Sequence, residues 1–453
     1  MHKRPSVEPV ETRANRAPAF YVDSVIVIIL VVGSGAREHA IIHSLAAERP
    51  AHELHAAPGN PGIAASGAAI HAIDPCDPAV VVALAKEIAA DLVVVGPEAP
   101  LVAGVVDALI AAGIPAFGPT AAAAQLEGSK AFAKNVMAAA DVPTAAARVC
   151  ANLEQVADAL DSFGAPHVVK DDGLAAGKGV VVTSDRDAAM AHAAAVLSAH
   201  TDARVVIEDF LDGPEVSLFC ISDGRTVVPL APAQDFKRAY DDDAGPNTGG
   251  MGAYSPLPWA PPGLVDEVLA RVAQPTIDEM ARRGTPFAGV LYVGLALTSR
   301  GLKVVEFNAR FGDPETQVIL ARLTSPLSAL LFAAATGRLT ELPPLRWTRS
   351  ACVNVVIAAQ NYPDTPRIGD PITGLQDIAA LPGVHVLHAG TALNADDELV
   401  SAGGRVLSVV GVGADLAGAR ERAYAGLSAI GLSGSHHRTD IAALAAHGEV
   451  QTP

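Results

Sequence analysis

The sequence is poor in cysteine, in aromatic residues and in basic charge. Its four cysteines, at positions 76, 150, 220 and 352, are far apart and form no CxxC pair. This usage predicts buried thiols in a reducing cytoplasm, with a disulfide-bonded secreted protein as the alternative. Lys and Arg number 32 against 49 Asp and Glu, and no basic cluster interrupts the net charge of −17. A nucleic-acid-binding face is therefore not expected, and an anionic substrate must be held by local amides, a few cations or metal.

Long apolar runs are also lacking. The run at residues 25–32 has eight residues, whereas a membrane span takes about 20. Because residues 1–24 are rich in Arg and Pro, a signal peptide is one interpretation of this region. The run leads directly into a glycine loop, however, which favours a buried first strand behind a disordered extension, or an upstream start codon for residues 1–24.

The length and the order of patterns predict several domains of mixed α/β and α+β class. With 453 residues, the chain is too long for one hydrophobic core. Residues 25–127 alternate apolar strands with glycine turns and helices, including a helix over 101–112, which predicts a parallel sheet with ligands at the carboxyl ends of its strands. Residues 128–345 contain antiparallel-looking strands, and a smaller α+β region follows.

Two glycine loops are candidate phosphate sites. The first, Gly33-Ser34-Gly35-Ala36-Arg37, follows the first strand, so that its amides and Arg37 suit a phosphate at a helix N-terminus; a tight structural turn is the alternative. Glu38 stands where a dinucleotide fingerprint has its third glycine, which argues against NAD. The second loop lies between Lys170 and Lys178 and suits polyphosphate oxygens, although a solvated β-hairpin would explain it too.

Three further segments carry polar groups at strand ends or in glycine-rich stretches. Residues 205–217 read VVIEDFLDGPEVS, which offers an adenine edge at residues 208–211 and a ribose acceptor at Glu215, or only an amphipathic strand pair. Residues 234–254 are predicted to form a long functional loop, with a disordered surface loop as the alternative. Strand alternation places Glu306 and Asn308 on one face, as Mg²⁺ ligands, with Arg310 next to them; an exposed polar face is the alternative.

Taken together, these segments resemble the ATP-grasp ligases and, within them, the phosphoribosylamine–glycine ligase family. The resemblance covers nearly the whole chain from residue 25, and a C-terminal string, SAGGRVLSVV from Ser401, matches only approximately. The strings that carry it occur in the family's order: GSGAREHA, GPEAPL, LEGSKAFAK, KDDGLAAGKGVVV, QDFKR, GPNTGGMGAY and EFNARFGDPETQ.

The resemblance implies a domain plan and a reaction. It implies a phosphoribosylamine-binding domain (25–127), an ATP-grasp domain (128–345) with a mobile lid at about 146–212, and a small C-terminal domain (346–447). ATP would phosphorylate glycine to glycyl phosphate, and 5-phosphoribosylamine would then expel phosphate to give glycinamide ribonucleotide in purine biosynthesis. Mg²⁺ or Mn²⁺ would assist. We expect a cytoplasmic monomer or weak dimer that binds no nucleic acid or membrane, and no fused further enzyme.

The resemblance also implies roles for individual residues. ATP would be bound by Lys130, Lys170, Gly173, Gly177, Lys178, Glu208, Phe210, Leu211 and Glu215. The metal would be bound by Glu306 and Asn308. Glycine and its acyl phosphate would be bound by Asp235, Lys237, Arg310, Gly249, Gly250 and Gly252, of which the first three are the candidate catalytic residues. Phosphoribosylamine would be bound by Gly33, Gly35, Arg37, Asn60 and Glu98.

The chain departs from the family pattern at two positions. Asp171 stands where the family often has Ala, and Phe236 stands where it often has His, so no histidine chemistry is assigned there. Three alternatives from other classes remain: a related ATP-grasp enzyme such as a biotin carboxylase or a formate-using transformylase, an NAD-dependent oxidoreductase, and a catalytically silent binding homologue.

Overall fold

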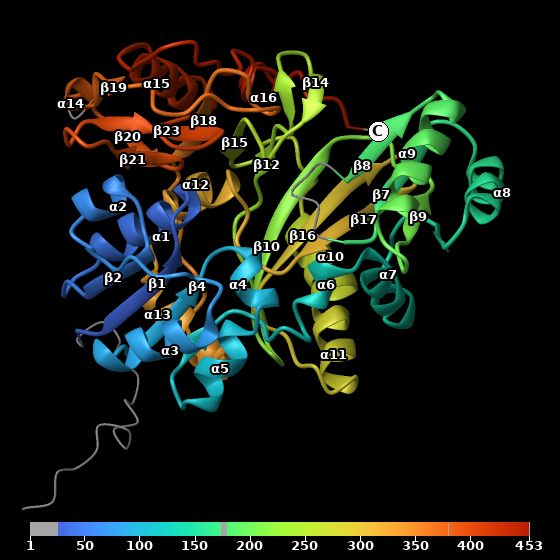
Figure 1. Cartoon of the computed structure of the whole chain (residues 1–453), viewed down its shortest axis with the longest axis horizontal. Helices are drawn as coiled ribbons and strands as arrows, with labels where there is room; N and C mark the ends of the chain where they lie inside the picture. Colours follow the sequence, from blue (N-terminus) through green and yellow to red (C-terminus); the bar gives the residue numbers. More distant parts are fainter. Residues whose placement is uncertain (1–25, 174–178, 379, 453) are drawn as a thin grey trace, which may run out of the picture.

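The computed structural model describes residues 26–173, 179–378 and 380–452, which form an N-terminal sheet domain, a central region with a projecting subdomain, and a C-terminal region (Figure 1). The extension expected at residues 1–24 lies outside the described residues. In the described part of the chain, no helix is long and apolar enough to cross a membrane.

The N-terminal domain contains the predicted parallel sheet, with strand order β3-β2-β1-β4-β5. The apolar, β-branched residues of its inner strands are buried on both faces, as helices on each side of a parallel sheet require. Its elements are β1 (Ile28–Gly33), α1 (Ala36–Ala46), β2 (Glu53–Pro58), α2 (Pro61–Ala65), β3 (Ala69–Ile70), α3 (Pro78–Glu87), β4 (Leu92–Val95) and β5 (Ala116–Phe117).

One predicted helix of this domain is divided. The expected helix over 101–112 is instead α4 (Glu98–Val102) followed by α5 (Val105–Ala111). Gly104 separates them with a φ of +82°, a left-handed conformation that glycine adopts without steric cost. The apolar pattern alone did not reveal this break.

The central region is built on an antiparallel sheet of order β11-β10-β16-β17. The helix before the projecting subdomain is α7 (Lys130–Ala139), which Ser129 caps by accepting from the amide of Phe132. The other elements are α6 (Gln125–Gly128), β10 (Glu215–Asp223), β11 (Val227–Pro229), α10 (Leu264–Val268), the π-helical η3 (Leu269–Ala273), α11 (Gln274–Arg282), β16 (Ala288–Thr298), β17 (Gly301–Asn308), α12 (Glu315–Leu320), α13 (Leu327–Ala335) and the 3₁₀ helix η4 (Leu339–Glu341).

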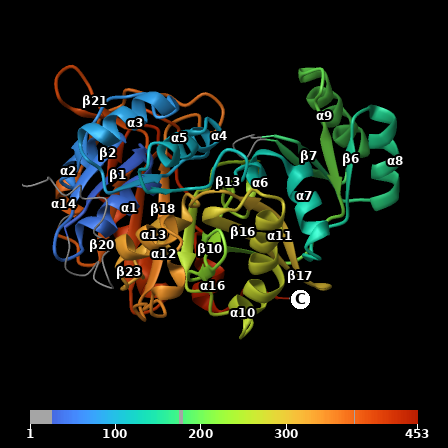
Figure 2. The same ribbon diagram turned by 90° about the horizontal axis from the view of Figure 1, so that it is seen from below.

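The projecting subdomain stands apart at one end of the molecule (Figures 1 and 2). Its antiparallel sheet of order β6-β9-β7-β8 packs against two helices around a small hydrophobic core of its own. Its elements are β6 (Ala147–Cys150), α8 (Leu153–Phe163), β7 (His167–Asp171), β8 (Val180–Thr183), α9 (Arg186–Ala199) and β9 (Val205–Glu208).

The C-terminal region shares its sheet with the segment predicted to be a loop over 234–254. The sheet order is β12-β15-β18-β23-β20, and two of its strands, β12 (Gln234–Asp235) and β15 (Gly252–Ser255), come from that segment. Between β12 and β15 in the sequence, β13 (Arg238–Tyr240) and β14 (Ala244–Asn247) form a separate two-stranded ribbon. The prediction of one long loop was therefore wrong. Its glycine content concealed short strands, one of which, β15, pairs with residues about a hundred positions away in β18.

The remaining elements complete or surround this sheet, and the C-terminal region lies against α1 and α2 (Figure 1). They are β18 (Ala351–Ala358), β19 (Ile372–Thr373), α14 (Leu375–Ile378), β20 (Val384–His388), β21 (Thr391–Leu393), β22 (Leu399–Ser401), β23 (Arg405–Gly413), α15 (Leu416–Ser428), β24 (Gly431–Leu432) and α16 (Ala443–His447). The mixed α/β architecture with a parallel N-terminal sheet confirms the predicted fold class.

Candidate active site

A cavity of about 1630 Å³ lies where the three parts of the molecule and the projecting subdomain meet. Side chains and backbone from all of them line it. The sequence-predicted site residues in its lining are Arg37, Glu98, Lys130, Lys170, Gly173, Glu208, Phe210, Leu211, Glu215, Asp235, Lys237, Gly249, Glu306, Asn308 and Arg310.

At the end of the cavity beneath the projecting subdomain, one buried carboxylate lies between two lysines. The Glu208 carboxylate contacts Lys170 Nζ at 3.0 Å and Lys134 Nζ at 3.2 Å. Burial lowers the pKa of Lys134, and the nearby Glu208 carboxylate offsets only part of this effect. Burial opposes the charge of Lys170 too, but Glu208 and Glu306 together hold the pKa of Lys170 above its ordinary value. Glu208 therefore orients both ammonium groups toward one end of the cavity.

Lys134 was missed in the sequence analysis, although a signal for it exists. It lies four residues after Lys130 in α7, so both side chains lie on one face of the helix. Lys130 Nζ donates to the carbonyl of Gly173 at 3.0 Å and so connects α7 to the start of the second glycine loop. Gly177 and Lys178 of that loop lie outside the described residues.

Asp235, Lys237 and Glu215 form an ion-pair cluster in the middle of the cavity. Lys237 Nζ contacts a Glu215 carboxylate oxygen and lies 3.3 Å from Asp235 Oδ1. Burial raises the pKa of Asp235 to about 7, against Lys237 and with help from Glu315 and Glu215. This is a carboxyl group whose charge changes near neutral pH.

A buried hydrogen-bond network behind this cluster was also missed. Glu315 Oε1 accepts from Ser217 Oγ at 3.0 Å and from the Tyr292 hydroxyl at 2.5 Å. These residues come from the first turn of α12 and from two neighbouring strands, β10 and β16, and no local sequence pattern connects them. The network gives the floor of the cavity a fixed arrangement of polar groups.

Arg310 is held by two carboxylates rather than left free for a ligand. Its Nη2 lies 3.1 Å from Glu127 Oε1 and its Nε lies 3.4 Å from Glu98 Oε2. Burial is the largest influence on the pKa of Glu127 and raises it, against Arg310. Burial would also raise the pKa of Glu98, but the positive charges of Arg310 and Arg37 outweigh it, so the pKa of Glu98 is lowered. A substrate that reaches Arg310 must share it with these acids.

Glu306 and Asn308 both line the cavity from the C-terminal end of strand β17. The β16–β17 register shifts between Gly294 and Leu295, so that Glu306 opposes Gly294 and Val304 opposes Leu295. This irregularity resets the alternation and leaves Glu306 and Asn308, but not Phe307 between them, on the half-buried face. A carboxylate and an amide oxygen fit a hard divalent cation that completes its shell with phosphate oxygens and water. Within the described ranges no group of three or more His, Cys, Asp and Glu could hold a metal alone.

In the N-terminal domain, Glu38 fills the space that the first glycine loop leaves. A Cβ atom at Gly33, Gly35 or Gly96 would lie less than 3.0 Å from the Glu38 side chain, which is 1% exposed. Glu38 accepts from the Gly35 amide at 2.6 Å and from Arg37 Nε at 2.5 Å. The loop amide and the arginine that were expected to face phosphate therefore have partners inside the protein.

Some predicted substrate residues lie behind the cavity wall. Gly33, Gly35, Asn60, Gly250 and Gly252 are not among its lining residues. Asn60 caps α2 through Ile63 N at 2.9 Å, and its amide nitrogen donates to the carbonyls of Ser34 and His388 at 2.8 and 2.9 Å. Its side chain connects the first glycine loop to the C-terminal region.

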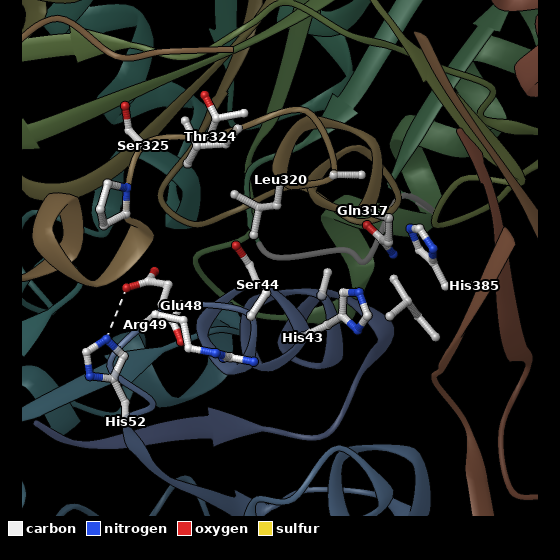
Figure 3. A pocket seen from close by; sticks show the side chains of 16 residues that line it. His43, Ser44, Glu48, Arg49, His52, Gln317, Leu320, Thr324, Ser325 and His385 are labelled. Carbon is white, nitrogen blue, oxygen red and sulfur yellow. Dashed lines mark hydrogen bonds and ion pairs between the residues drawn. The ribbon is translucent and has the colours of Figure 1, made fainter. Parts of the chain in front are cut away.

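A second, smaller cavity of about 400 Å³ lies on the C-terminal half of α1, outside the main site (Figure 3). His43 and His385 stack there with ring centroids 5.2 Å apart. At its other end, His52 Nε2 lies 3.0 Å from Glu48 Oε2 (Figure 3). No residue proposed for the site from the sequence lines this cavity.

Comparison with known proteins follows the same three-part division. The phosphoribosylglycinamide synthetase N domain matches residues 27–127, the ATP-grasp (A) domain of the same family matches residues 128–316, and its C domain matches residues 352–444. A phosphoribosylamine–glycine ligase of Streptomyces coelicolor is 65% identical over 92% of this chain and 99% of that protein. The Leifsonia xyli protein of the same name is 59% identical over 92% of this chain and 100% of that protein.

Solved structures agree with this result. A phosphoribosylamine–glycine ligase of Thermotoga maritima has a TM-score of 0.79 and 31% identity, and the match covers 92% of this chain and 100% of that one. A biotin carboxylase of Campylobacter jejuni has a TM-score of 0.68 at 15% identity, covering 91% of this chain and 93% of that one. At that identity the likeness is one of fold alone.

The fold and the cavity define the class of protein as an ATP-dependent carboxylate–amine ligase of the ATP-grasp type. The three domain matches span most of the chain in order, and the relatives are matched over nearly their full length. The chain belongs to the phosphoribosylglycinamide synthetase family.

Proposed function

We propose a division of labour among the residues of the large cavity for the family's reaction, the ATP-dependent ligation of glycine to phosphoribosylamine in purine biosynthesis. The observation that carries it is the convergence on one cavity of Lys170 with Glu208, Asp235 with Lys237, and Glu306 with Asn308. These pairs come from parts of the chain that the sequence separates widely. They supply the cations, the oxygen ligands and the mixed-charge pocket that the reaction needs.

In this proposal, ATP lies between the projecting subdomain and the central sheet. Lys130 and Lys170 hold its phosphates beside Gly173, residues 208–211 hold adenine, and Glu215 holds the ribose. Glu306 and Asn308 hold Mg²⁺ or Mn²⁺, which when bound offsets the negative charge of the phosphates. The projecting subdomain acts as a lid over residues 146–212, keeping water from a reactive acyl phosphate.

The chemistry has two steps, because hydroxide is a poor leaving group for a direct reaction of carboxylate with amine. A glycine carboxylate oxygen attacks the γ-phosphorus of ATP, giving glycyl phosphate and ADP. The phosphoribosylamine nitrogen then attacks the acyl carbon, the C–O bond to phosphate breaks, and the nitrogen loses a proton. Asp235, Lys237 and Arg310 orient the glycine, and Arg37 and Glu98 lie on the phosphoribosylamine side.

The same proposal covers where and with whom the enzyme acts. Its ligands are small molecules, and we place it in the cytoplasm as a monomer or weak dimer without a nucleic-acid or membrane partner. The functional division of the chain is an N-terminal substrate domain at 25–127, an ATP-grasp domain at 128–345 and a C-terminal domain at 346–447.

A substrate-omission assay tests the proposed function. Purified protein is given ATP, Mg²⁺, glycine and freshly generated phosphoribosylamine, and both phosphate release and glycinamide ribonucleotide are measured. We expect product only when all four are present. Replacing glycine by bicarbonate is the control for carboxylase chemistry, since biotin carboxylases share the fold. Equal ATP consumption without glycine, or no ribonucleotide product, would contradict the proposal.

A further inference from the structure

The C-terminal string SAGGRVLSVV has no role in the reaction described above, yet it lies at the wall of the cavity. Its glycines bring two chain segments unusually close. A Cβ atom at Gly403 would lie 3.1 Å from the Cα of Gly390, and one at Gly404 would lie 2.4 Å from a ring carbon of Tyr362. Any side chain at these positions would displace the start of β23, where Arg405 stands among the cavity-lining residues.

Arg405 crosses from the C-terminal region to the two central segments that carry predicted site residues. Its Nη1 donates to the carbonyl oxygens of Gly249, Gly250 and Asp313, the last two at 3.2 and 2.9 Å. Its Nη2 lies 3.0 Å from Asp313 Oδ2. Tyr362, also from the C-terminal region, accepts at its hydroxyl from the Gly249 amide at 3.1 Å. The turn at 249–250 is thus held through both its N–H and its carbonyl groups.

This turn is connected by backbone hydrogen bonds to the ion-pair cluster. Thr248 donates to the Lys237 carbonyl twice, from its amide at 2.7 Å and from its hydroxyl at 2.8 Å. The Met251 amide donates to the Phe236 carbonyl at 2.7 Å. A shift of the turn therefore moves the backbone of Lys237, whose ammonium group meets Glu215 and Asp235.

The guanidinium of Arg405 is engaged by protein groups and is not positioned to bind a substrate directly. Its two terminal nitrogens are engaged by three carbonyls and one carboxylate, and its side chain is 20% exposed. Burial alone would raise the pKa of Asp313, but Arg405 and then Arg37 outweigh it, so the pKa of Asp313 is lowered. Arg405 is therefore held to Asp313 by hydrogen bonds and by opposite charge.

We propose that Arg405 is a positioning residue for the glycine subsite: from the C-terminal region it fixes the 248–250 turn, and through that turn the placement of Lys237 beside Asp235. This inference rests on the proposed function, which places glycine at Asp235 and Lys237. Arg405 is not among the residues proposed to hold ATP, so its loss should affect glycine rather than nucleotide. Lysine in its place keeps the charge but lacks the planar fork that reaches several oxygens at once.

The test compares steady-state constants and thermal stability of three variants with those of the wild type. For Arg405→Gln we expect kcat/KM for glycine to fall about 100-fold, because an ångström-scale displacement of a positioning group costs about that much. The KM for ATP should stay within about twofold. Arg405→Lys should recover only part of the loss. Tyr362→Phe, which removes only the hydroxyl that accepts from Gly249, should raise the KM for glycine about threefold to tenfold, the worth of one hydrogen bond.

Arg367→Ala is the matched control, because Arg367 is a C-terminal-region arginine that contacts Asp370 and the Ser433 carbonyl outside the cavity lining. It should keep wild-type constants. A wild type that forms no glycinamide ribonucleotide would refute the proposed function itself. An active wild type with an Arg405→Gln variant of unchanged KM for glycine, or with ATP and glycine constants impaired equally, would refute the positioning role alone. A variant that lost its fold would show in its melting curve, and Tyr362→Phe would then decide.

Discussion

At the scale of single residues, the site depends on carboxyl groups whose charge is set by their neighbours. Glu208 is buried, Asp313 is half-buried and the Glu215 side chain is 47% exposed, and each has a cation within contact distance. Asp235 is different, since burial and two nearby acids outweigh Lys237 and raise its pKa to about 7. Two acids of the cavity, Glu306 and Asp235, lead to separate predictions.

The first prediction concerns Glu306. Replacing it with Ala removes one of two oxygen donors on the half-buried face of β17, so metal-dependent ligation should be abolished while the fold persists. Turnover with Mg²⁺ and with Mn²⁺ is measured alongside the circular dichroism spectrum and melting curve. Near-normal turnover would remove the metal assignment, and Lys303→Ala on the same strand, outside the cavity lining, is the control.

The second prediction concerns Asp235 and pH. Below about 7 the raised pKa leaves Asp235 protonated, and the neutral acid attracts the ammonium group of glycine and Lys237 less strongly. The kcat/KM for glycine should therefore fall about tenfold for each pH unit below that value. Asp235→Asn should have a low value that is flat across the same range. A wild-type profile that is flat between pH 5.5 and about 8, measured under pulse supply of phosphoribosylamine, would contradict this role.

At the scale of secondary structure, local patterns predicted the elements whose boundaries are marked by local signals. The buried first strand expected from the apolar run at 25–32 is present as β1. Elements that depend on distant partners were not predictable. The strands β12 and β15 carry no apolar alternation of their own and form because β15 pairs with β18. The turn at Gly104 was missed because helix-like periodicity continues on both sides of it.

The candidate site shows the same limit. The residues in recognisable strings were predictable, and most of them line the cavity. The Glu315 network and the Arg405 contacts include pairs that are more than 90 residues apart, such as Ser217–Glu315 and Arg405–Asp313. A single sequence gives no signal for such pairs.

A prediction at this scale separates a structural from a binding role for Asn60. Asn60→Ala removes the cap of α2 and leaves the carbonyls of Ser34 and His388 without their donor. We expect the free energy of unfolding to fall by about 2 kcal/mol, from one lost cap and from two partly buried acceptors that lose their donor. Urea denaturation measures the loss. Full stability with a raised KM for phosphoribosylamine would instead support direct substrate binding.

At the scale of the whole molecule, histidines join the N-terminal domain to the C-terminal region. His39 Nδ1 accepts from the His388 amide at 2.8 Å, and its Nε2 lies 3.0 Å from Ser66 Oγ. Burial, followed by the proximity of His388 and His43, lowers the pKa of His39 to about 3, and burial lowers the pKa of His388 to about 4. The junction is therefore built from neutral imidazoles.

This arrangement predicts acid sensitivity. A histidine whose pKa is depressed by folding costs stability as pH falls below its unfolded value of 6.5 toward its folded value. For His39 alone, the free energy of unfolding should fall by about 2 kcal/mol between pH 7 and pH 5. His39→Gln should be less stable at pH 7 but should lose about 2 kcal/mol less on the same acidification. Equal losses in both proteins would contradict the prediction.

The shared sheet of the C-terminal region has a consequence for how such an enzyme can be divided or recombined. Because β15 lies between β12 and β18, residues proposed to position glycine belong to the same continuous sheet as strands of the C-terminal region. If the polypeptide were cut before β18, separating the two pieces would leave β15 and β18 each as an unpaired sheet edge. We therefore expect the two halves to co-purify after such a cut, and neither to serve as an exchangeable cassette in a chimeric enzyme.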